Sequence, residues 1–531
     1  MKRFRIVFLV CILSLTACSG EISQKKSEIQ QKELTQQEAG TQNKEGSQKE
    51  NTQKECAQEE GTQKSDNSGE TAVITQEGQS PEEKACPSYQ LNLRFDPVLH
   101  TISGTEIVTL TNSSDDAWNQ LCFRDYPSDR WFAENAKGRT TDITNISLSY
   151  PAGNTSEGTL IRDMEENTIL YFPLEKALQP QESITVSFEL CVYIPVVNDR
   201  FGHSELSDNL GYFFPILSIY REGSWVNHPP ARYGECAYSE CAEFDVKVTA
   251  PEDYTIITTG ELLSKENHVS TFHAEKVRDF TMVIGNQYDV VSEENNGVTI
   301  NSYYKKGNDK AGKRALDAAV ASVKAYTKAI GAYPYPSLDC VETSIGGGME
   351  YPQLIMLADE LYSLDNEALS MVTAHETAHQ WFYGIIGNDQ YDEAWIDEGF
   401  ASYLEGVYYE ATGQDSLAIR YEERAISEEV YSRGNGSKNE VERKNASINQ
   451  SYDVYGETSR YVKMVYHKAA EFLITLRQSI GEDAFTSAVQ QIYTTYKFKE
   501  ATTEEILDIF KSNTDKDLTA LFDYYFYPEE K

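Results

Sequence analysis

A change in hydrophobic period near Val298 constrains the fold of this chain more than any other feature. Between residues 86 and 290, stretches such as YQLNLRFDP and TISGTEIVTLTN alternate apolar and polar residues, which is typical of half-buried strands. Turn-forming pairs such as Asp96-Pro97 separate these stretches, and no long amphipathic pattern interrupts them. We therefore expect an all-β domain at residues 86–290.

Helical spacing takes over beyond this point. A strand, VTINSYYKKG, precedes a long helical pattern that ends near Gly331, and two more predicted strands, SLDCVETSI and QLIMLADEL, flank the stretch GGGMEYP. Further helices are expected at 368–383, 398–411, 461–479 and 503–512. This order predicts a mixed α/β and then helical domain at residues 291–531, and a multidomain α+β protein as a whole.

The first 20 residues, MKRFRIVFLVCILSLTACSG, have a basic start, an apolar core too short for a membrane span, and small residues before Cys18. This pattern is typical of a secretory signal, and LTAC resembles the lipobox of bacterial lipoproteins, whose cysteine carries the lipid. We expect a signal peptide at 1–18, lipidation of Cys18, and a location outside the cytoplasm on the cell membrane. An ordinary cleavable signal with a coincidental cysteine is the alternative.

Residues 19–85 are rich in Gln, Glu, Lys, Ser and Thr and contain ragged repeats such as TQKE. Such a segment cannot bury enough apolar surface to offset chain entropy, so we expect a disordered polar tether. The formal net charge of the chain is −37, which argues against nucleic acid as a partner. Cys236 and Cys241 are near enough in sequence to pair in an oxidising compartment, and two free thiols are the alternative.

The motif that carries chemistry is His375-Glu-Thr-Ala-His379, within a helical pattern. Residues i and i+4 share one face of a helix, so both imidazoles would point at one metal ion. Glu376 lies one step round the helix, close enough to a metal-bound water to act as its general base. Catalytic zinc takes three protein ligands, and Glu398, 398 − 379 = 19 positions beyond His379, is the candidate third ligand. We expect one zinc ion per chain.

His-Glu-x-x-His, eighteen residues and then Glu resembles the signature of the M1 aminopeptidases, gluzincins related to thermolysin. AWIDEGFASYLE is similar to the helix that carries the family's glutamate ligand, and GGGMEYP is similar to its Gly-x-Met-Glu-Asn motif. LNLRFDPVLHTISGTEIVTLTN is similar to the family's opening strands. The resemblance covers about residues 88–500. It implies a saddle-like N-terminal β domain followed by a thermolysin-like metallopeptidase domain.

The resemblance also implies roles for individual residues. His375, His379 and Glu398 would bind zinc, and Glu376 would be the general base. Glu350 would bind the free α-amine of the substrate. An extended peptide could pair with the backbone of the glycine-rich stretch before it, at Gly347, Gly348 and Met349.

The family also uses a tyrosine phenol to stabilise the oxyanion, and YHKAAEFLITLRQSIGEDAF makes Tyr466 the candidate. Three tyrosines nearby compete for this role, namely Tyr452, Tyr455 and Tyr461. Asp397 and Glu405 are candidates for orienting the zinc ligands.

The sequence departs from the family pattern at several points. Tyr351 stands where the family has Asn after the amine-binding glutamate, and Ala469 stands where the family has Gly. A second acidic or amide group at the amine site has no clear match, and Glu235 and Glu240 occupy its neighbourhood.

The function implied by the resemblance is a zinc-dependent aminopeptidase that removes N-terminal residues from peptides outside the cytoplasm. Its expected partners are peptides with a free N-terminus and a membrane reached through the lipid anchor. A zinc endopeptidase or other zinc hydrolase on the same fold is one alternative. A non-catalytic, surface-binding lipoprotein that keeps the fold is another.

Overall fold

The computed structural model describes residues 86–151, 153–231, 234–235, 237–364, 366–426 and 447–527. All of them belong to one compact unit. The predicted signal peptide with Cys18, the predicted tether at 19–85, and Cys236 of the predicted cysteine pair lie outside the described residues. Within the described part of the chain, no helix is both long and apolar enough to cross a membrane.

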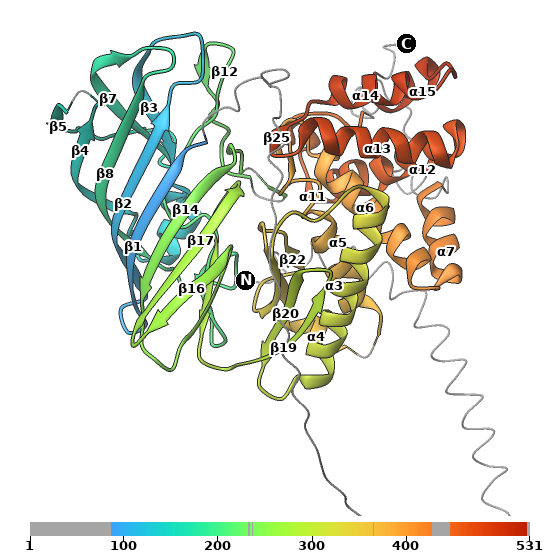
Figure 1. Ribbon diagram of the computed structural model, residues 1–531, viewed down its shortest axis with the longest axis horizontal. Helices are drawn as coiled ribbons and strands as arrows, with labels where there is room; N and C mark the ends of the chain where they lie inside the picture. Colours follow the sequence, from blue (N-terminus) through green and yellow to red (C-terminus); the bar gives the residue numbers. More distant parts are fainter. Residues whose placement is uncertain are drawn as a thin grey trace, which may run out of the picture. The chain divides into compact units, whose positions relative to one another are not determined.

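An eight-stranded sheet dominates the N-terminal part, as the alternating sequence pattern predicts (Figure 1). Its central strands β1 and β2 pair antiparallel, and β1 also pairs parallel with β14. Side chains along β14 alternate between buried and exposed, so one face of the sheet covers a core. Across the sheet, the strands are β16 (Glu261–Glu266), β17 (Val269–Val277), β14 (Ala242–Thr249), β1 (Ser88–Asp96), β2 (Thr101–Thr111), β8 (Ser183–Tyr193), β4 (Asp142–Ser149) and β5 (Thr155–Glu157).

Smaller sheets pack against this large one. The ring of Phe172 in β7 stacks on Phe188 in β8 with centroids 5.7 Å apart, which joins two sheets through their apolar faces. The first small sheet runs β11 (Ile216–Leu217), β3 (Trp118–Arg124), β7 (Ile169–Leu178) and β6 (Ile161–Arg162). The second runs β15 (Thr255–Thr258), β18 (Met282–Gly285), β10 (Asp208–Leu210) and β9 (Phe201–His203), and a β12 (Tyr220–Arg221)–β13 (Ser224–Trp225) ribbon stands beside them.

A five-stranded sheet opens the C-terminal part. Three of its strands, β20, β21 and β23, run parallel, and helix α3 (Asp309–Ala329) forms the crossover between the first two. The strand β22 pairs antiparallel with β23 and lies at the end of this sheet. The order is β19 (Tyr288–Asn295), β20 (Val298–Lys305), β21 (Ser337–Thr343), β23 (Leu354–Ala358) and β22 (Gly348–Met349).

A short parallel pair, β24 (Ile386–Gly387) and β25 (Lys499–Glu500), also lies in this part. Helices form most of the rest, including α4 (Asp359–Tyr362), α5 (Ala368–Ala378), α6 (Trp395–Ala411), α7 (Asp415–Ile426), α10 (Tyr452–Tyr455), α11 (Thr458–Tyr461), α12 (Ala469–Ile480), α13 (Glu482–Tyr496), α14 (Thr503–Ser512) and α15 (Thr519–Tyr525). Three predicted helices were wrong in extent. The one expected at 398–411 begins three residues earlier, at Trp395. The one expected at 368–383 ends at Ala378, because the N–H groups of 384, 385 and 386 bond back five residues and Tyr383 has φ 110°. The one expected at 461–479 is interrupted by a π-helical segment, η3 (Val462–Lys468).

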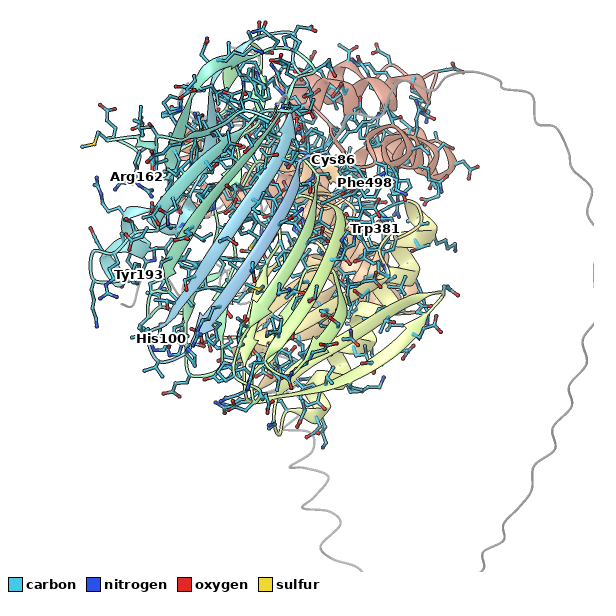
Figure 2. The ribbon with its side chains drawn as sticks, turned by 60° about the vertical axis from the view of Figure 1, so that its left-hand side comes forward. Cys86, His100, Arg162, Tyr193, Trp381 and Phe498 are labelled. Carbon is cyan, nitrogen blue, oxygen red and sulfur yellow. The ribbon has the colours of Figure 1, made fainter. Side chains whose placement is uncertain are left out.

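Arg278, just after β17, joins the N-terminal sheets to the C-terminal part. Its guanidinium donates to the carbonyl of Tyr383 (2.7 Å) and pairs with Glu500 (3.1 Å). A side chain at Gly387 would place its Cβ 2.1 Å from the Arg278 guanidinium carbon, so any larger residue would displace this guanidinium. Figure 2 shows Cys86 at the start of β1 and His100 past its other end, with Trp381 and Phe498 in the C-terminal part.

Candidate functional site

Three side chains converge between α5 and α6 in the arrangement that the sequence predicts. His375 lies on α5, His379 caps its C-terminus, and Glu398 lies in the first turn of α6. The Nε2 atoms of the histidines are 3.3 Å apart, and the Oε2 atom of Glu398 lies 3.3 Å and 3.4 Å from them. A tetrahedral ion with ligand bonds of 2.0–2.1 Å separates its ligand atoms by about 3.4 Å. The three atoms therefore fit zinc.

Hydrogen bonds with neighbouring groups orient the two histidine ligands. Glu405, two turns after Glu398 on α6, places Oε1 2.9 Å from Nδ1 of His375. Nδ1 of His379 donates to the carbonyl of Phe382 at 3.2 Å. With Nδ1 occupied on both rings, Nε2 is left as the ligand atom. Of the two candidates for this role, Glu405 touches a ligand.

Asp397 lies elsewhere. Its carboxylate accepts from Asn388 (3.0 Å) and Gln390 (2.7 Å), which fixes the segment before α6.

The electrostatics of the cluster favour positive charge at its centre. Burial alone raises the pKa of Glu398, but the hydrogen bonds from His375 and His379 lower it to about 2. Burial lowers the pKa of His379, yet the neighbouring carboxylates of Glu350 and Glu398 raise it to about 9. Buried carboxylates that stabilise the protonated form of a neighbouring histidine would also stabilise a bound divalent cation.

Glu376 lies at the same point without belonging to the three ligands. It is buried, and burial raises the pKa of its carboxyl to about 8. Its carboxylate lies against Gly348 of β22, where an added Cβ would approach Oε1 to 2.1 Å. Glycine at 348 is thus required by the close approach of strand β22 to Glu376.

Glu350 follows β22 and faces the same cluster. Its ligating oxygen, one atom of Glu376 and one of His379 all lie within 4.8 Å of one another. The Oε1 atom of Glu350 is buried and has no hydrogen-bond partner among the described residues. A buried, unpartnered carboxylate oxygen is costly, so a donor from a bound molecule would stabilise it.

The glycine-rich stretch before Glu350 forms β22, the end strand of the described sheet. A peptide can pair with a sheet only along such an end strand. Gly348 and Met349 pair with β23 on one side. The carbonyl of Gly347 accepts from Ala358 at 2.8 Å, and its φ of 94° explains the glycine. Gly347 therefore anchors the strand, and its carbonyl already has a partner.

Tyr466, in the π-helical segment η3, is placed at the ligand set. Its hydroxyl donates to Oε1 of Glu398, and its ring stacks on that of His375 with centroids 5.9 Å apart. Burial raises the pKa of this phenol well above its ordinary value, so the hydroxyl stays protonated. Among the competing tyrosines, Tyr455 donates instead to the carbonyl of Ile448 at 3.0 Å, and the ring of Tyr461 lies against Gly234.

Two contributors to the site were missed by reasoning from sequence. Gln380 accepts from the backbone of Gln353 (2.7 Å) and donates to the carbonyl of Tyr351 (3.0 Å), so it couples the end of α5 to the loop after Glu350. In the sequence, only the position of Gln380 directly after His379 could have pointed to this role. Arg200 forms an ion pair with Glu235. Burial raises the pKa of Glu350, and the charge of Arg200 acts in the opposite direction.

The departures from the family pattern have structural counterparts. Tyr351 is buried, and its ring packs edge-on against Tyr212 with centroids 5.1 Å apart. Ala469 is the first residue of α12, and its methyl group faces Gly399 of α6, where an added Cβ would come within 2.6 Å. The two helices approach closely because both positions are small.

Comparison with known proteins finds similarity over part of the chain. Residues 314–525 match the model of the peptidase family M1 domain. Aminopeptidase 2, mitochondrial, of Saccharomyces cerevisiae is 27% identical over 257 residues, which cover 44% of this chain and 25% of that protein. The puromycin-sensitive aminopeptidase of Caenorhabditis elegans is 23% identical over 289 residues, which cover 50% of this chain and 30% of that protein. The match thus spans between a quarter and a third of these relatives.

The fold is similar to that of a solved structure. The M1 zinc metallopeptidase from Deinococcus radiodurans superposes with a TM-score of 0.59 at 15% identity, over 84% of this chain and 94% of that one. At this level of identity the likeness concerns the fold: a β-rich N-terminal region followed by a helical C-terminal region with a mixed sheet.

Proposed function

We propose that this chain, whose residues 314–525 form a peptidase family M1 domain, is a zinc-dependent aminopeptidase that acts on peptides with a free N-terminus. The observation that carries the proposal is the pairing of two features at one place. Three ligand atoms stand 3.3–3.4 Å apart, and the unpartnered Oε1 of Glu350 faces the same cluster. The first feature suits a hydrolytic metal, and the second suits an ammonium group.

His375, His379 and Glu398 would hold the zinc ion, with Glu405 orienting the first of them. Zinc bound at such a site lowers the pKa of water and polarises a carbonyl. Glu376 is the group that takes up a proton. Burial raises the pKa of Glu376 to about 8, so it can hold a proton near neutral pH and return it to the leaving amine.

Tyr466 supplies the donor for the negative charge that develops on the scissile carbonyl oxygen. Its phenol keeps its proton because burial raises its pKa, and its hydroxyl already points at the ligand carboxylate of Glu398. A donor held in place before the reaction costs no reorganisation when the charge forms.

Glu350 decides which peptide bond is cut. A carboxylate that binds the α-ammonium group of the substrate places the first peptide bond over the metal ligands and excludes internal bonds. β22 would align the peptide by backbone pairing along the sheet edge. Glu376 would therefore transfer the proton, and Glu350 would set which peptide bond lies over the metal ligands.

The proposal includes a location outside the cytoplasm, with Cys18 lipidated and the enzyme held at the cell membrane. It is supported by the order of features in the first 20 residues: basic start, short apolar core, small residues and cysteine. Labelling of cells with an alkynyl fatty acid tests it. Wild type should incorporate the label and Cys18→Ser should not, whereas equal labelling of both would contradict the assignment.

Hydrolysis of a panel of aminoacyl chromogenic amides tests the proposed chemistry. We expect turnover in wild type, its loss on treatment with a zinc chelator, and a fall in kcat of about 10²–10⁴-fold for Glu376→Gln. Glu367→Gln, an exposed glutamate at the start of the same helix, is the matched control and should keep wild-type kcat. Undiminished turnover in Glu376→Gln would refute the assigned base.

A further inference from the structure

A second cluster of ligand-type side chains lies in the N-terminal part, on strands and turns that contribute no residue to the site above. It consists of His100, His203 and Asp208, and one ligand atom of each lies within 4.8 Å of the other two. Oδ1 of Asp208 is 3.0 Å from Nδ1 of His203 and 3.7 Å from Nδ1 of His100. Nδ1 of His100 is buried and has no hydrogen-bond partner in the described part of the chain.

Three segments that are far apart in sequence hold this cluster in place. His203 and Asp208 are directly opposed residues of the β9–β10 hairpin, whose turn is closed by the Ser204 hydroxyl. His100 ends the turn between β1 and β2, with φ 50°, and its carbonyl accepts from Ile194 at 2.9 Å. Figure 2 places His100 at this end of the large sheet. Backbone hydrogen bonds thus hold in place the segments from which the three ligand side chains project.

A bound cation would balance the charge of the buried carboxylate in this cluster. Asp208 is only 4% exposed, and its ion-pair partners among the described residues are the two histidines. Two imidazoles and one carboxylate are a donor set that suits zinc.

We propose that His100, His203 and Asp208 form a second zinc site, which ties the β1–β2 turn to the β9–β10 hairpin. The His100 and His203 rings are 3.9 Å apart at their centroids, closer than the 4.9 Å between His375 and His379. Binding requires these two rings to open by about that difference, which is within reach of side chains whose exposed fractions are 31% and 28%. The fourth position of the ion would be taken by water.

Zinc counting by mass spectrometry on the full-length protein tests the proposal. The protein is loaded with Zn²⁺ and desalted before the count. Wild type should hold one zinc per chain more than the double variant His100→Gln/His203→Gln. The matched control is His273→Gln, since His273 forms a His–Asp pair with Asp245 (2.9 Å) that lacks a second histidine. This control should equal wild type.

The difference between wild type and the double variant decides the question. Equal counts in the two would overturn the second site. Counts of one and zero would support it while refuting zinc at His375, His379 and Glu398, so the two failures are distinguishable. If the double variant does not fold, His100→Gln alone gives the same comparison, because its side chain is a third exposed.

Discussion

At the scale of single residues, the oxyanion role of Tyr466 makes the sharpest prediction. Tyr466→Phe removes only the hydroxyl at Glu398, so kcat should fall about 10²–10³-fold while KM changes little. Tyr455→Phe is the matched control, because it removes a buried hydroxyl whose bond is to Ile448. Steady-state kinetics on one aminoacyl amide measures both. A kcat within twofold of wild type for Tyr466→Phe would remove the phenol from the mechanism.

Glu405 acts through His375, and its effect should appear in metal affinity. Glu405→Gln removes the charge at Nδ1, so zinc affinity should fall about 10–100-fold. Competition with a fluorescent chelator measures the affinity. Glu410→Gln, a glutamate on the same helix that pairs with Arg477, should leave it unchanged. If both variants bound zinc as wild type does, the orienting role of Glu405 would be wrong.

Local spacing, together with the resemblance of the motifs to a known family, made most of the site predictable at this scale. The four-residue spacing of the histidines, the position of Glu398, and the motif around Tyr466 each placed a side chain that the structure brings to one point. Arg200 and Gln380 could not be predicted, because their roles depend on which distant backbone or charge lies beside them. Asp397 shares a helix with Glu405, and only the fold shows which of the two faces a ligand.

At the scale of elements, the close approach of β22 to α5 should be intolerant of a single methyl group. A Cβ at 348 would lie 2.1 Å from Oε1 of Glu376, so Gly348→Ala should displace that carboxylate and reduce kcat by an order of magnitude or more. Gly346→Ala is the matched control, since no atom lies within 4 Å of its added Cβ.

Kinetics and thermal unfolding of both glycine variants separate the two effects. Gly348→Ala should unfold within a few degrees of wild type. Wild-type kcat in Gly348→Ala would show that β22 can move away without consequence for Glu376.

Helix ends show where sequence reasoning works and where it fails. α14 was predicted to the residue, and in the structure Thr502 and Glu505 form a capping box at its start. The end of α5 was missed, since residues 379–383 keep apolar helical spacing while the carbonyls of His379, Gln380 and Trp381 accept from residues five positions later. The π-helical segment η3 was missed for a similar reason: one wide turn hardly changes the pattern of buried residues.

At the scale of the whole molecule, burial of Asp339 in β21 makes stability depend on pH. Burial raises the pKa of this carboxyl from 3.8 to about 7, although Asn301 donates to it at 2.7 Å. Between these pH values the folded chain binds more protons than the unfolded chain, so the free energy of unfolding falls as pH rises. Asp339→Asn removes this loss and should be more stable than wild type at pH 8, by up to about 4 kcal/mol.

Urea unfolding at pH 4 and pH 8 measures this effect. The advantage of Asp339→Asn should be present at pH 8 and absent at pH 4. Asp289→Asn, at an exposed position of β19, should show no such difference between the two pH values. An equal advantage at both values would mean that Asp339 does not titrate between them.

The order of β and helical regions was predicted from hydrophobic period, and the likeness in fold to a solved M1 metallopeptidase confirms it. The way the two regions join was not predictable. Arg278 reaches from β17 to Tyr383 and Glu500, which lie more than 100 and more than 200 positions away along the chain. A contact between residues so far apart cannot be predicted from local sequence patterns.

The central claim is that a free N-terminus, held by Glu350, sets which bond is cut. The most direct measurement compares one peptide with its N-acetylated form and identifies the products by mass. We predict stepwise loss of N-terminal residues from the free peptide and no cleavage of the acetylated one. Cleavage of both forms at internal bonds, at similar rates, would contradict the claim and indicate an endopeptidase on the same fold.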